Sequence, residues 1–275
     1  MINESTSTIW LDGATEPDQV TRNVGGGELV AYTRRAPDKD SENQDAVVII
    51  PYGPQSCVLA VADGAGGMPA GRRASQTALA SLDASLQVAA SETMLLRTAI
   101  LNGIEAANQA VLDLANGSAT TMTVVTIEGR LARTYQIGDS EALIAGQRGV
   151  IRAQTMAHSP TGFAVEAGFL DQQEALHHEE RHLVSNFIGT TDMRIDMGPE
   201  TELREFDTVL VASDGLTDNL HLHEIMELIR TGLLQSSLDA IVERATSRMN
   251  SDATAEPSKP DDLSIILFRK ARKST

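Results

Sequence analysis

The spacing of apolar segments constrains the fold of this chain most. Seven short runs rich in Val, Ile, Leu and Thr have the composition and length of β-strands. They are AVVII (46–50), CVLAVA (57–62), TMTVVTI (121–127), ARTYQI (132–137), EALIA (141–145), TVLVA (208–212) and LSIILF (263–268). Several are separated only by short Gly-containing turns, such as EGR at 128–130. Because tight turns join antiparallel strands, whereas parallel strands need long crossovers, the pattern predicts antiparallel hairpins.

Helical periodicity occupies segments between these strand blocks. Apolar residues recur every three or four positions, as a helix that buries one stripe requires, in three segments. The stripes are Leu79, Leu82 and Leu86; Leu96, Ile100, Ile104, Ala107, Val111 and Leu114; and Leu238, Ile241, Val242, Ala245 and Met249. Pairs of helices that separate blocks of antiparallel strands favour a layered α+β domain over a doubly wound parallel sheet.

The composition fits one large domain with an aliphatic core. Of the 275 residues, 41% are hydrophobic but only 3% are aromatic. A polar start and a glycine run at 25–27 predict a loose extension over residues 1–27. We expect the folded domain over 28–270 and a short tail over 271–275, with SDATAEPSKP (251–260) as a loop.

Charge and cysteine content exclude several classes of protein. The formal net charge of -16 opposes binding to nucleic acid or to an anionic membrane surface. The N-terminus lacks the pattern of a signal peptide, and no run has the roughly 18 apolar residues of a membrane span, which predicts a cytoplasmic protein. Cys57 is the only cysteine, so an intramolecular disulfide and a thiolate zinc cluster are excluded, and its apolar surroundings predict a buried, unreactive thiol.

Aspartates flank five of the predicted strands. Asp63, Asp139 and Asp214 follow strands, whereas Asp45 and Asp261, the latter with a second aspartate after it, precede strands. In antiparallel sheets strand starts lie beside strand ends, so all five can share one rim. A single such aspartate is more often a turn residue or helix cap, and SDGLTDNL (213–220) is a good capping sequence.

Five carboxylates at one rim predict a cation site. Crowded like charges must be neutralised by protonation or by a cation, and a hard divalent ion suits an all-oxygen site. The glycines of DGAGG (63–67) let the backbone come close, so the Gly64 carbonyl can be a further ligand. Such a set suits two Mg²⁺-like ions and a bridging water, an arrangement that favours in-line displacement at phosphorus.

In their order along the chain these motifs resemble the protein phosphatase type 2C family, the metal-dependent serine/threonine phosphatases, and in particular its compact bacterial members. The matching segments are ENQDA (42–46), VADGAGGMPAG (61–71), GSATTMTVV (117–125), IGDSEALI (137–144), VASDGLTD (211–218) and PDDLSIIL (260–267). Residues 157–190 resemble the flap of the family, and the resemblance covers about residues 28–269.

The resemblance implies a four-layer α-β-β-α sandwich of two mainly antiparallel sheets flanked by helix pairs. It implies hydrolysis of phosphoserine or phosphothreonine in proteins by a water that bridges two Mn²⁺ or Mg²⁺ ions, with a third ion seen in some members. It implies phosphorylated proteins as substrates and a serine/threonine kinase as partner. The metal ligands it implies are Asp45, Asp63, the Gly64 carbonyl, Asp214 and Asp261, with Asp139 for the third ion.

The chain departs from the family pattern at three places. Asp40 stands where the family has a phosphate-binding arginine, Glu141 where GDSR has its arginine, and Ala65 where eukaryotic members have a histidine proposed as general acid. These changes affect substrate affinity more than catalysis, because every core ligand remains. The candidates to replace the phosphate-binding arginine are Arg34, Arg35 and Lys39, each equally well explained as a surface charge.

Two other functions compete with this interpretation. HEERH (178–182) matches a zinc metalloprotease motif with His178, Glu179 and His182, but its charged surroundings favour a solvated flap helix. A phosphatase-like module that binds phosphoproteins without catalysis is the other alternative, although such a module should have lost a metal aspartate. His221 and His223, near a predicted helix start, are expected to be surface or capping residues.

Overall fold

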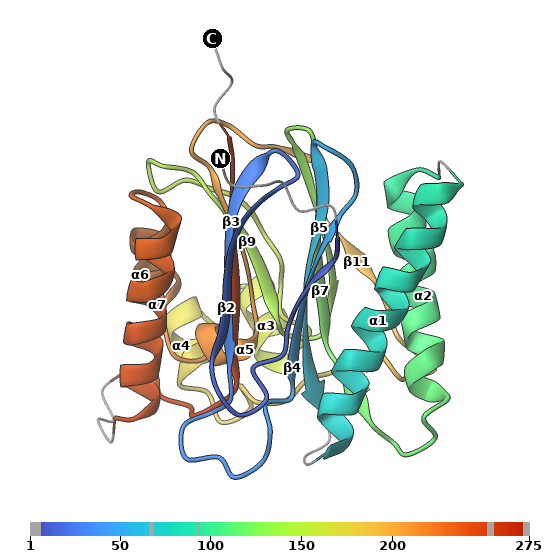
Figure 1. The fold of residues 1–275 in the computed structure, drawn as a ribbon. Coiled ribbons are helices and arrows are strands. Elements are labelled where there is room, and N and C mark those ends of the chain that lie inside the picture. Colours follow the sequence, from blue (N-terminus) through green and yellow to red (C-terminus); the bar gives the residue numbers. More distant parts are fainter. Residues whose placement is uncertain (1–6, 66–68, 93, 252–255, 272–275) are drawn as a thin grey trace.

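The computed structural model describes residues 7–65, 69–92, 94–251 and 256–271. Two antiparallel sheets face each other, and a pair of helices covers the outer side of each (Figure 1). The predicted four-layer α-β-β-α sandwich is therefore confirmed.

The first sheet has the strand order β1-β4-β5-β7-β8-β11, with the short β6 on β5 and β12 on β8. Its strands are β1 (Ile9–Leu11), β4 (Asp45–Pro51), β5 (Ser56–Ala65), β6 (Ala119–Thr120), β7 (Met122–Glu128), β8 (Leu131–Ile137), β11 (Asp196–Met197) and β12 (Thr201–Glu202). Helices α1 (Pro69–Ser91) and α2 (Leu96–Leu112) lie on its outer face (Figure 1).

The second sheet has the order β10-β9-β13-β14-β3-β2. Its strands are β2 (Asp18–Val24), β3 (Gly27–Arg34), β9 (Glu141–Ala145), β10 (Ile151–Gln154), β13 (Thr208–Ala212) and β14 (Leu263–Lys270). Helices α6 (Leu222–Ile229) and α7 (Leu234–Met249) cover it, and the short α3 (Pro160–Glu166), α4 (Gln172–Leu176) and α5 (Asp214–Thr217) lie near one end of the sandwich (Figure 1).

Three apolar clusters hold the four layers together. Leu82 and Ile104 belong to the cluster between the first helix pair and its sheet. Ile49 and Phe268 belong to the cluster between the two sheets, and Leu238 to the one beneath α7. Aliphatic side chains dominate all three, as the low aromatic content predicts.

The N-terminal segment differs from its prediction. Residues 18–24 form β2, which pairs along its whole length with β3, and residues 9–11 pair with β4. The expectation of a loose extension over 1–27 is therefore wrong for these strands, while residues 1–6 lie outside the described part. Gly25 and Gly26, both with positive φ, form the turn of the β2-β3 hairpin, and Gly27 begins β3, so this run does not mark the start of ordered structure.

The flap region is tied to the sandwich at both of its ends. His158 is 2% exposed, and its Nδ1 accepts hydrogen bonds from the backbone N–H of Gly138 and from Asn186. Because two donors point at Nδ1, the ring proton is on Nε2, which lies 3.0 Å from Asp196 Oδ2. Ile188 bridges to Thr120 at the other end. None of the described helices is long and apolar enough to cross a membrane.

Candidate metal centre

The first sheet supplies two aspartates at adjacent positions. Asp45 begins β4 and Asp63 lies near the end of β5, and the two residues are directly paired in the antiparallel register. The backbone N–H of Asp63 donates to Thr121 Oγ1 at 2.9 Å. Strand start and strand end thus meet at one rim, as predicted.

The second sheet supplies two more aspartates at the same rim. Asp214 begins α5 just after β13, and Asp261 lies just before β14, the antiparallel neighbour of β13. Ser213 Oγ donates to Asp45 Oδ2 at 2.7 Å and so links the two sheets. Ser213, not Asp214, is the N-cap residue of α5, which leaves the Asp214 carboxylate for other contacts.

Electrostatic interactions show that the aspartates form one cluster. Burial raises the pKa of Asp63 well above the usual range of an aspartate, and Asp45, Asp214, Asp261 and Asp139 each raise it further. The structure therefore brings together all five carboxylates that the sequence predicts at one rim.

The cluster contains more negative charge than its surroundings neutralise. Burial, followed by neighbouring carboxylates, raises the pKa of Asp45 and Asp139 well above the usual range, and it raises the pKa of Asp261 to about 6. Among the described atoms, Oδ1 of Asp45, Oδ1 of Asp139 and Oδ1 of Asp214 are buried and lack a hydrogen-bond partner. Burying a carboxylate oxygen without a partner costs free energy of folding, and such oxygens are good ligands for hard divalent cations. The residues present therefore fit Mn²⁺ or Mg²⁺.

A close backbone contact explains two of the glycines in this region. A Cβ on Gly71, in the first turns of α1, would lie 2.6 Å from the carbonyl oxygen of Gly64 in β5. A side chain at either position would push the strand and the helix apart. Glycine at both positions therefore permits the close approach of β5 and α1.

Lys259 is a member of the rim that the sequence did not reveal. Its Nζ lies 2.5 Å from Asp214 Oδ2, 2.7 Å from Asp218 Oδ2 and 3.1 Å from Asp261 Oδ2. Burial opposes its charge, but these three carboxylates outweigh burial and raise the pKa of the ammonium. Asp218 ends the VASDGLTD segment, whereas no local pattern marks Lys259, because its partners Asp214 and Asp218 lie far back in the chain.

Asp262 holds the loop before β4, and its negative charge contributes to the raised pKa of Asp45. It accepts hydrogen bonds from the backbone N–H of Ala36 and Gln44, both at 2.7 Å, and from Lys39 Nζ at 2.6 Å. Lys39 is thus the phosphate-binding candidate that contacts the aspartate region. Arg34 instead donates to Thr246 on α7.

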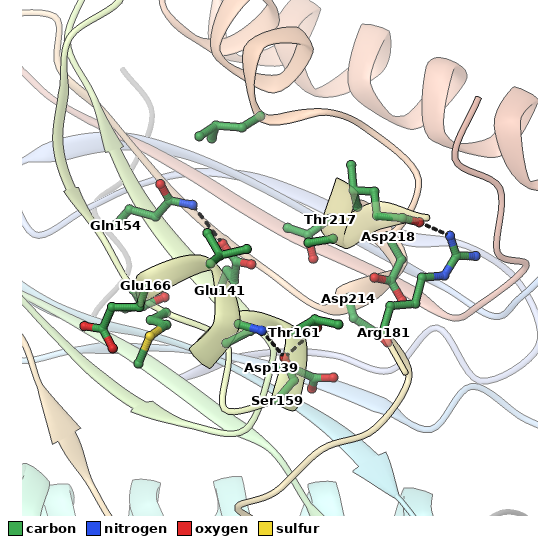
Figure 2. A pocket seen from close by; sticks show the side chains of 18 of the residues that line it. Asp139, Glu141, Gln154, Ser159, Thr161, Glu166, Arg181, Asp214, Thr217 and Asp218 are labelled. Carbon is green, nitrogen blue, oxygen red and sulfur yellow. Dashed lines mark hydrogen bonds between the residues drawn. The ribbon is translucent and has the colours of Figure 1, made fainter. Parts of the chain in front are cut away.

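A cavity of about 330 Å³ opens beside the rim under α3 and α4 (Figure 2). Its walls combine apolar side chains with the carboxylates of Asp139, Glu141, Glu166, Asp214 and Asp218. Gln154 donates to Glu141, and burial raises the pKa of Glu141 to about 7. A second, smaller cleft is lined by Asp63, Asp139 and Asp214 together with the flap residues His182 and Phe187.

The HEERH segment is not a zinc helix. Helix α4 ends at Leu176, and residues 179–182 form a turn, so the two histidines are not one helical turn apart on one face. Arg181 holds this turn by donating to the carbonyls of Leu176 and Ser258. The expected flap helix over this segment is therefore also wrong.

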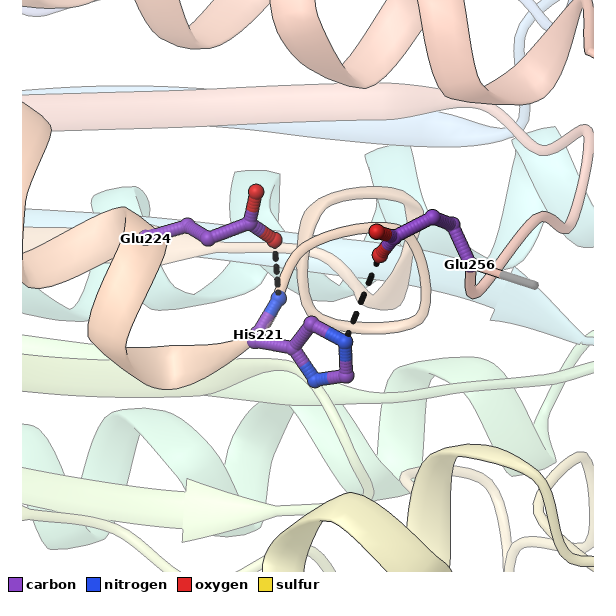
Figure 3. Close-up of side chains that lie close together, drawn as sticks. All are labelled: His221, Glu224 and Glu256. Carbon is purple, nitrogen blue, oxygen red and sulfur yellow. Dashed lines mark hydrogen bonds and ion pairs between the residues drawn. The ribbon is translucent and has the colours of Figure 1, made fainter.

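A separate group of His221, Glu224 and Glu256 brings its ligand atoms within 4.8 Å of one another (Figure 3). Arginines already pair with both carboxylates: Arg248 lies 2.9 Å from Glu224 and 3.1 Å from Glu256, and Arg244 lies 3.4 Å from Glu224. His221 is the N-cap residue of α6, and its backbone N–H donates to Glu224. This group stabilises a helix start, and the expectation of a capping role is confirmed for His221; His223 is exposed.

Comparison with known proteins agrees with this geometry. The family described as protein phosphatase 2C matches residues 34–255, most of the chain. The chain belongs to the protein phosphatase 2C family. The resemblance of its motifs to this family is thereby confirmed.

Individual 2C-family phosphatases align over most of their length. Protein phosphatase PhpP of Streptococcus pneumoniae is 29% identical over 203 residues, which cover 71% of this chain and 81% of PhpP. The phosphatase MsPP of Mycobacterium smegmatis, solved with cacodylate, is 26% identical with a TM-score of 0.73, covering 88% of this chain and 98% of MsPP. The catalytic domain of PstP, solved with two manganese ions, is 22% identical with a TM-score of 0.69, covering 92% and 99%, and shares the fold.

Proposed function

We propose that this protein hydrolyses phosphoserine and phosphothreonine in proteins, using two Mn²⁺ or Mg²⁺ ions. The ligands are Asp45, Asp63, the Gly64 carbonyl, Asp214 and Asp261, with Asp139 available to a third ion. The observation that carries the proposal is the meeting of aspartates from both sheets at one rim, where three buried carboxylate oxygens lack partners among the described residues.

The protein positions these groups before any substrate arrives. When bound, the ions supply a nucleophile from water and neutralise charge on the phosphoryl group. Ser213 orients Asp45, and Thr121 accepts from the backbone of Asp63. The ligands rest on strand ends and on a helix start, which are more rigid supports than free loops.

The substrate would enter between the rim and the flap. The cavity in Figure 2 adjoins Asp139 and Asp214, so it can receive a side chain next to the phosphorylated residue. Of Lys39 and Arg34, Lys39 is better placed to meet the phosphate, since it contacts Asp262 beside Asp45, whereas Arg34 is bound to α7. Phosphoproteins of this kind are products of serine/threonine kinases, and a kinase partner is part of the proposal.

Hydrolysis of a phosphothreonine peptide by chelator-treated protein tests the function. We expect no turnover without metal, restored turnover with Mn²⁺ or Mg²⁺, and none with Zn²⁺ alone. Activity with Zn²⁺ only would contradict the proposal. No turnover with any ion, together with binding of the phosphopeptide, would instead identify a phosphoprotein-binding module.

A further inference from the structure

The backbone of Lys259 is held in a fixed position by a buried side chain. The N–H of Lys259 donates to Asn219 Oδ1, and Asn219 Nδ2 donates back to the Lys259 carbonyl, both at 2.8 Å. Asn219 is 0% exposed and also donates to the carbonyl of Gly215. Ser258 adds a hydrogen bond to the Arg248 carbonyl at 2.8 Å. These hydrogen bonds fix the position of the Lys259 backbone, from which the side chain extends.

From this point the ammonium reaches the second-sheet half of the rim. It contacts Asp214 and Asp261, two proposed metal ligands, and Asp218, which is not one. The side chains of Asp214 and Asp218 are 10% and 13% exposed, and Lys259 is 24% exposed. Exposed ion pairs contribute little, but these carboxylates are largely removed from water.

The first-sheet half of the rim has no such cation. Asp45 accepts from a serine hydroxyl, and no described lysine or arginine forms an ion pair with Asp45 or Asp63. The two halves of the proposed dinuclear site therefore differ in charge compensation: one contains a tethered ammonium and the other does not.

We propose that Lys259 is a tethered cation that competes with the divalent ion for Asp214 and Asp261. This inference rests on the proposed function, because it concerns the same metal site. A group tethered close to its partner acts at an effective concentration of the order of millimolar, without any external supply. An ion held by Asp45, Asp63 and the Gly64 carbonyl would bind without this competitor, whereas an ion at Asp214 and Asp261 would have to displace Lys259.

Asp218 provides a place for the displaced ammonium. Because Asp218 lies 2.7 Å from Lys259 and is not a proposed ligand, the lysine can keep this pair when an ion takes Asp214 and Asp261. The two arrangements of Lys259 then correspond to low and high occupancy of the second metal position. Metal concentration, through Lys259, would set how much of the protein is fully loaded.

Titration of the metal-free, full-length protein with Mn²⁺ tests the inference. We expect calorimetry and electron paramagnetic resonance to resolve one tight and one weak ion in the unmodified protein. Lys259→Met, which keeps the length of the side chain but removes its charge, should tighten the second ion about tenfold or more, equivalent to ~1.4 kcal/mol, and change the first far less. Arg133→Met is the control, because Arg133 pairs with Glu200, which is not a proposed ligand.

Two further variants keep the test decisive if Lys259→Met folds poorly. Lys259→Arg retains the charge and should leave the second ion weak. Asp218→Asn removes the alternative partner of the ammonium and should weaken the second ion further. An unchanged or weaker second ion in Lys259→Met, or a tighter one in Asp218→Asn, would overturn the inference.

Failure of the proposed function gives a different result. If the unmodified protein binds no Mn²⁺ and hydrolyses no phosphopeptide, the metal site itself is wrong. If it binds two ions and is active, but Lys259→Met behaves as the unmodified protein does, only the competition by Lys259 is wrong.

Discussion

Asp63 has four negatively charged neighbours, so substituting this one residue tests the proposed metal site directly. Its pKa is raised by burial and by Asp45, Asp214, Asp261 and Asp139. Crowded like charges in a buried position destabilise the metal-free fold. Removal of the Asp63 carboxylate should therefore separate function from stability.

We expect Asp63→Asn to lower phosphopeptide hydrolysis at least about 100-fold, since a proposed metal ligand is lost. In chelator the free energy of unfolding should be unchanged or higher, because repulsion at the rim is relieved. Urea denaturation and kinetics at neutral pH measure both quantities. Asp192→Asn, at an exposed aspartate, is the control. Full activity in Asp63→Asn would refute the ligand assignment.

Burial suppresses ionisation of the Cys57 thiol. It is fully buried in β5, and burial raises its pKa to about 12, although Lys270 lowers it in part. Because the folded pKa lies above the unfolded one, this contribution to stability is complete below about pH 9 and is lost only as pH rises through about 12. The expected buried thiol is confirmed.

A thiol reagent at pH 8 should therefore leave the folded protein unmodified and label one thiol per chain after unfolding. Absorbance after addition of the reagent, with and without denaturant, measures this. Rapid labelling of the folded protein would show that β5 opens locally at Cys57.

At the scale of elements, the junction between β5 and α1 determines where the Gly64 carbonyl lies. Gly64 and Gly71 are in backbone contact, so the helix start presses against the strand end. The same strand carries Asp63, so movement of this junction moves two proposed ligands together. Close packing here links the first helix pair to the metal centre.

Gly71→Ala should cost about 1–3 kcal/mol of stability, because its Cβ would lie 2.6 Å from the Gly64 oxygen. It should also weaken binding of the tighter Mn²⁺ ion. Gly103→Ala on α2 is the control, since its Cβ meets the side chain of Leu82 rather than the rim. Thermal unfolding and calorimetry check the pair. Equal metal affinities in both variants would argue against a role for the Gly64 carbonyl.

At the scale of the whole molecule, we expect the negative charge to influence which substrates approach. The net charge is -16, and acidic side chains line the cavity beside the rim. An acidic protein repels anionic ligands at a distance and attracts cationic ones, and salt screens both effects.

Phosphothreonine peptides with arginine on both sides of the phosphorylated residue should therefore have a higher kcat/KM than peptides with glutamate there. The ratio should fall as ionic strength rises from low to physiological values. Peptides flanked by alanine provide the reference. A preference for glutamate at low salt would contradict this view of the cavity.

Periodicity and motif order were sufficient to predict the central strands, the long helices and the shared rim. Strands that hydrogen-bond to sequence neighbours bring their ends together with little help from the rest of the chain, as Asp45 and Asp63 show. The family motifs lie on those same strand ends. For this reason both fold class and proposed ligands could be predicted from local patterns.

Tertiary contacts alone decided the rest. β2 has a polar sequence, DQVTRNV, and is ordered by pairing with β3 rather than by its own pattern. HEERH is a turn because Arg181 bonds to Leu176 and Ser258, and Lys259 enters the rim because Asn219, some distance back in the chain, holds its backbone. The sequence by itself determined which residues could bind a cation. Contacts between distant segments decided which charged side chains lie together at the rim. No local sequence pattern encodes such contacts.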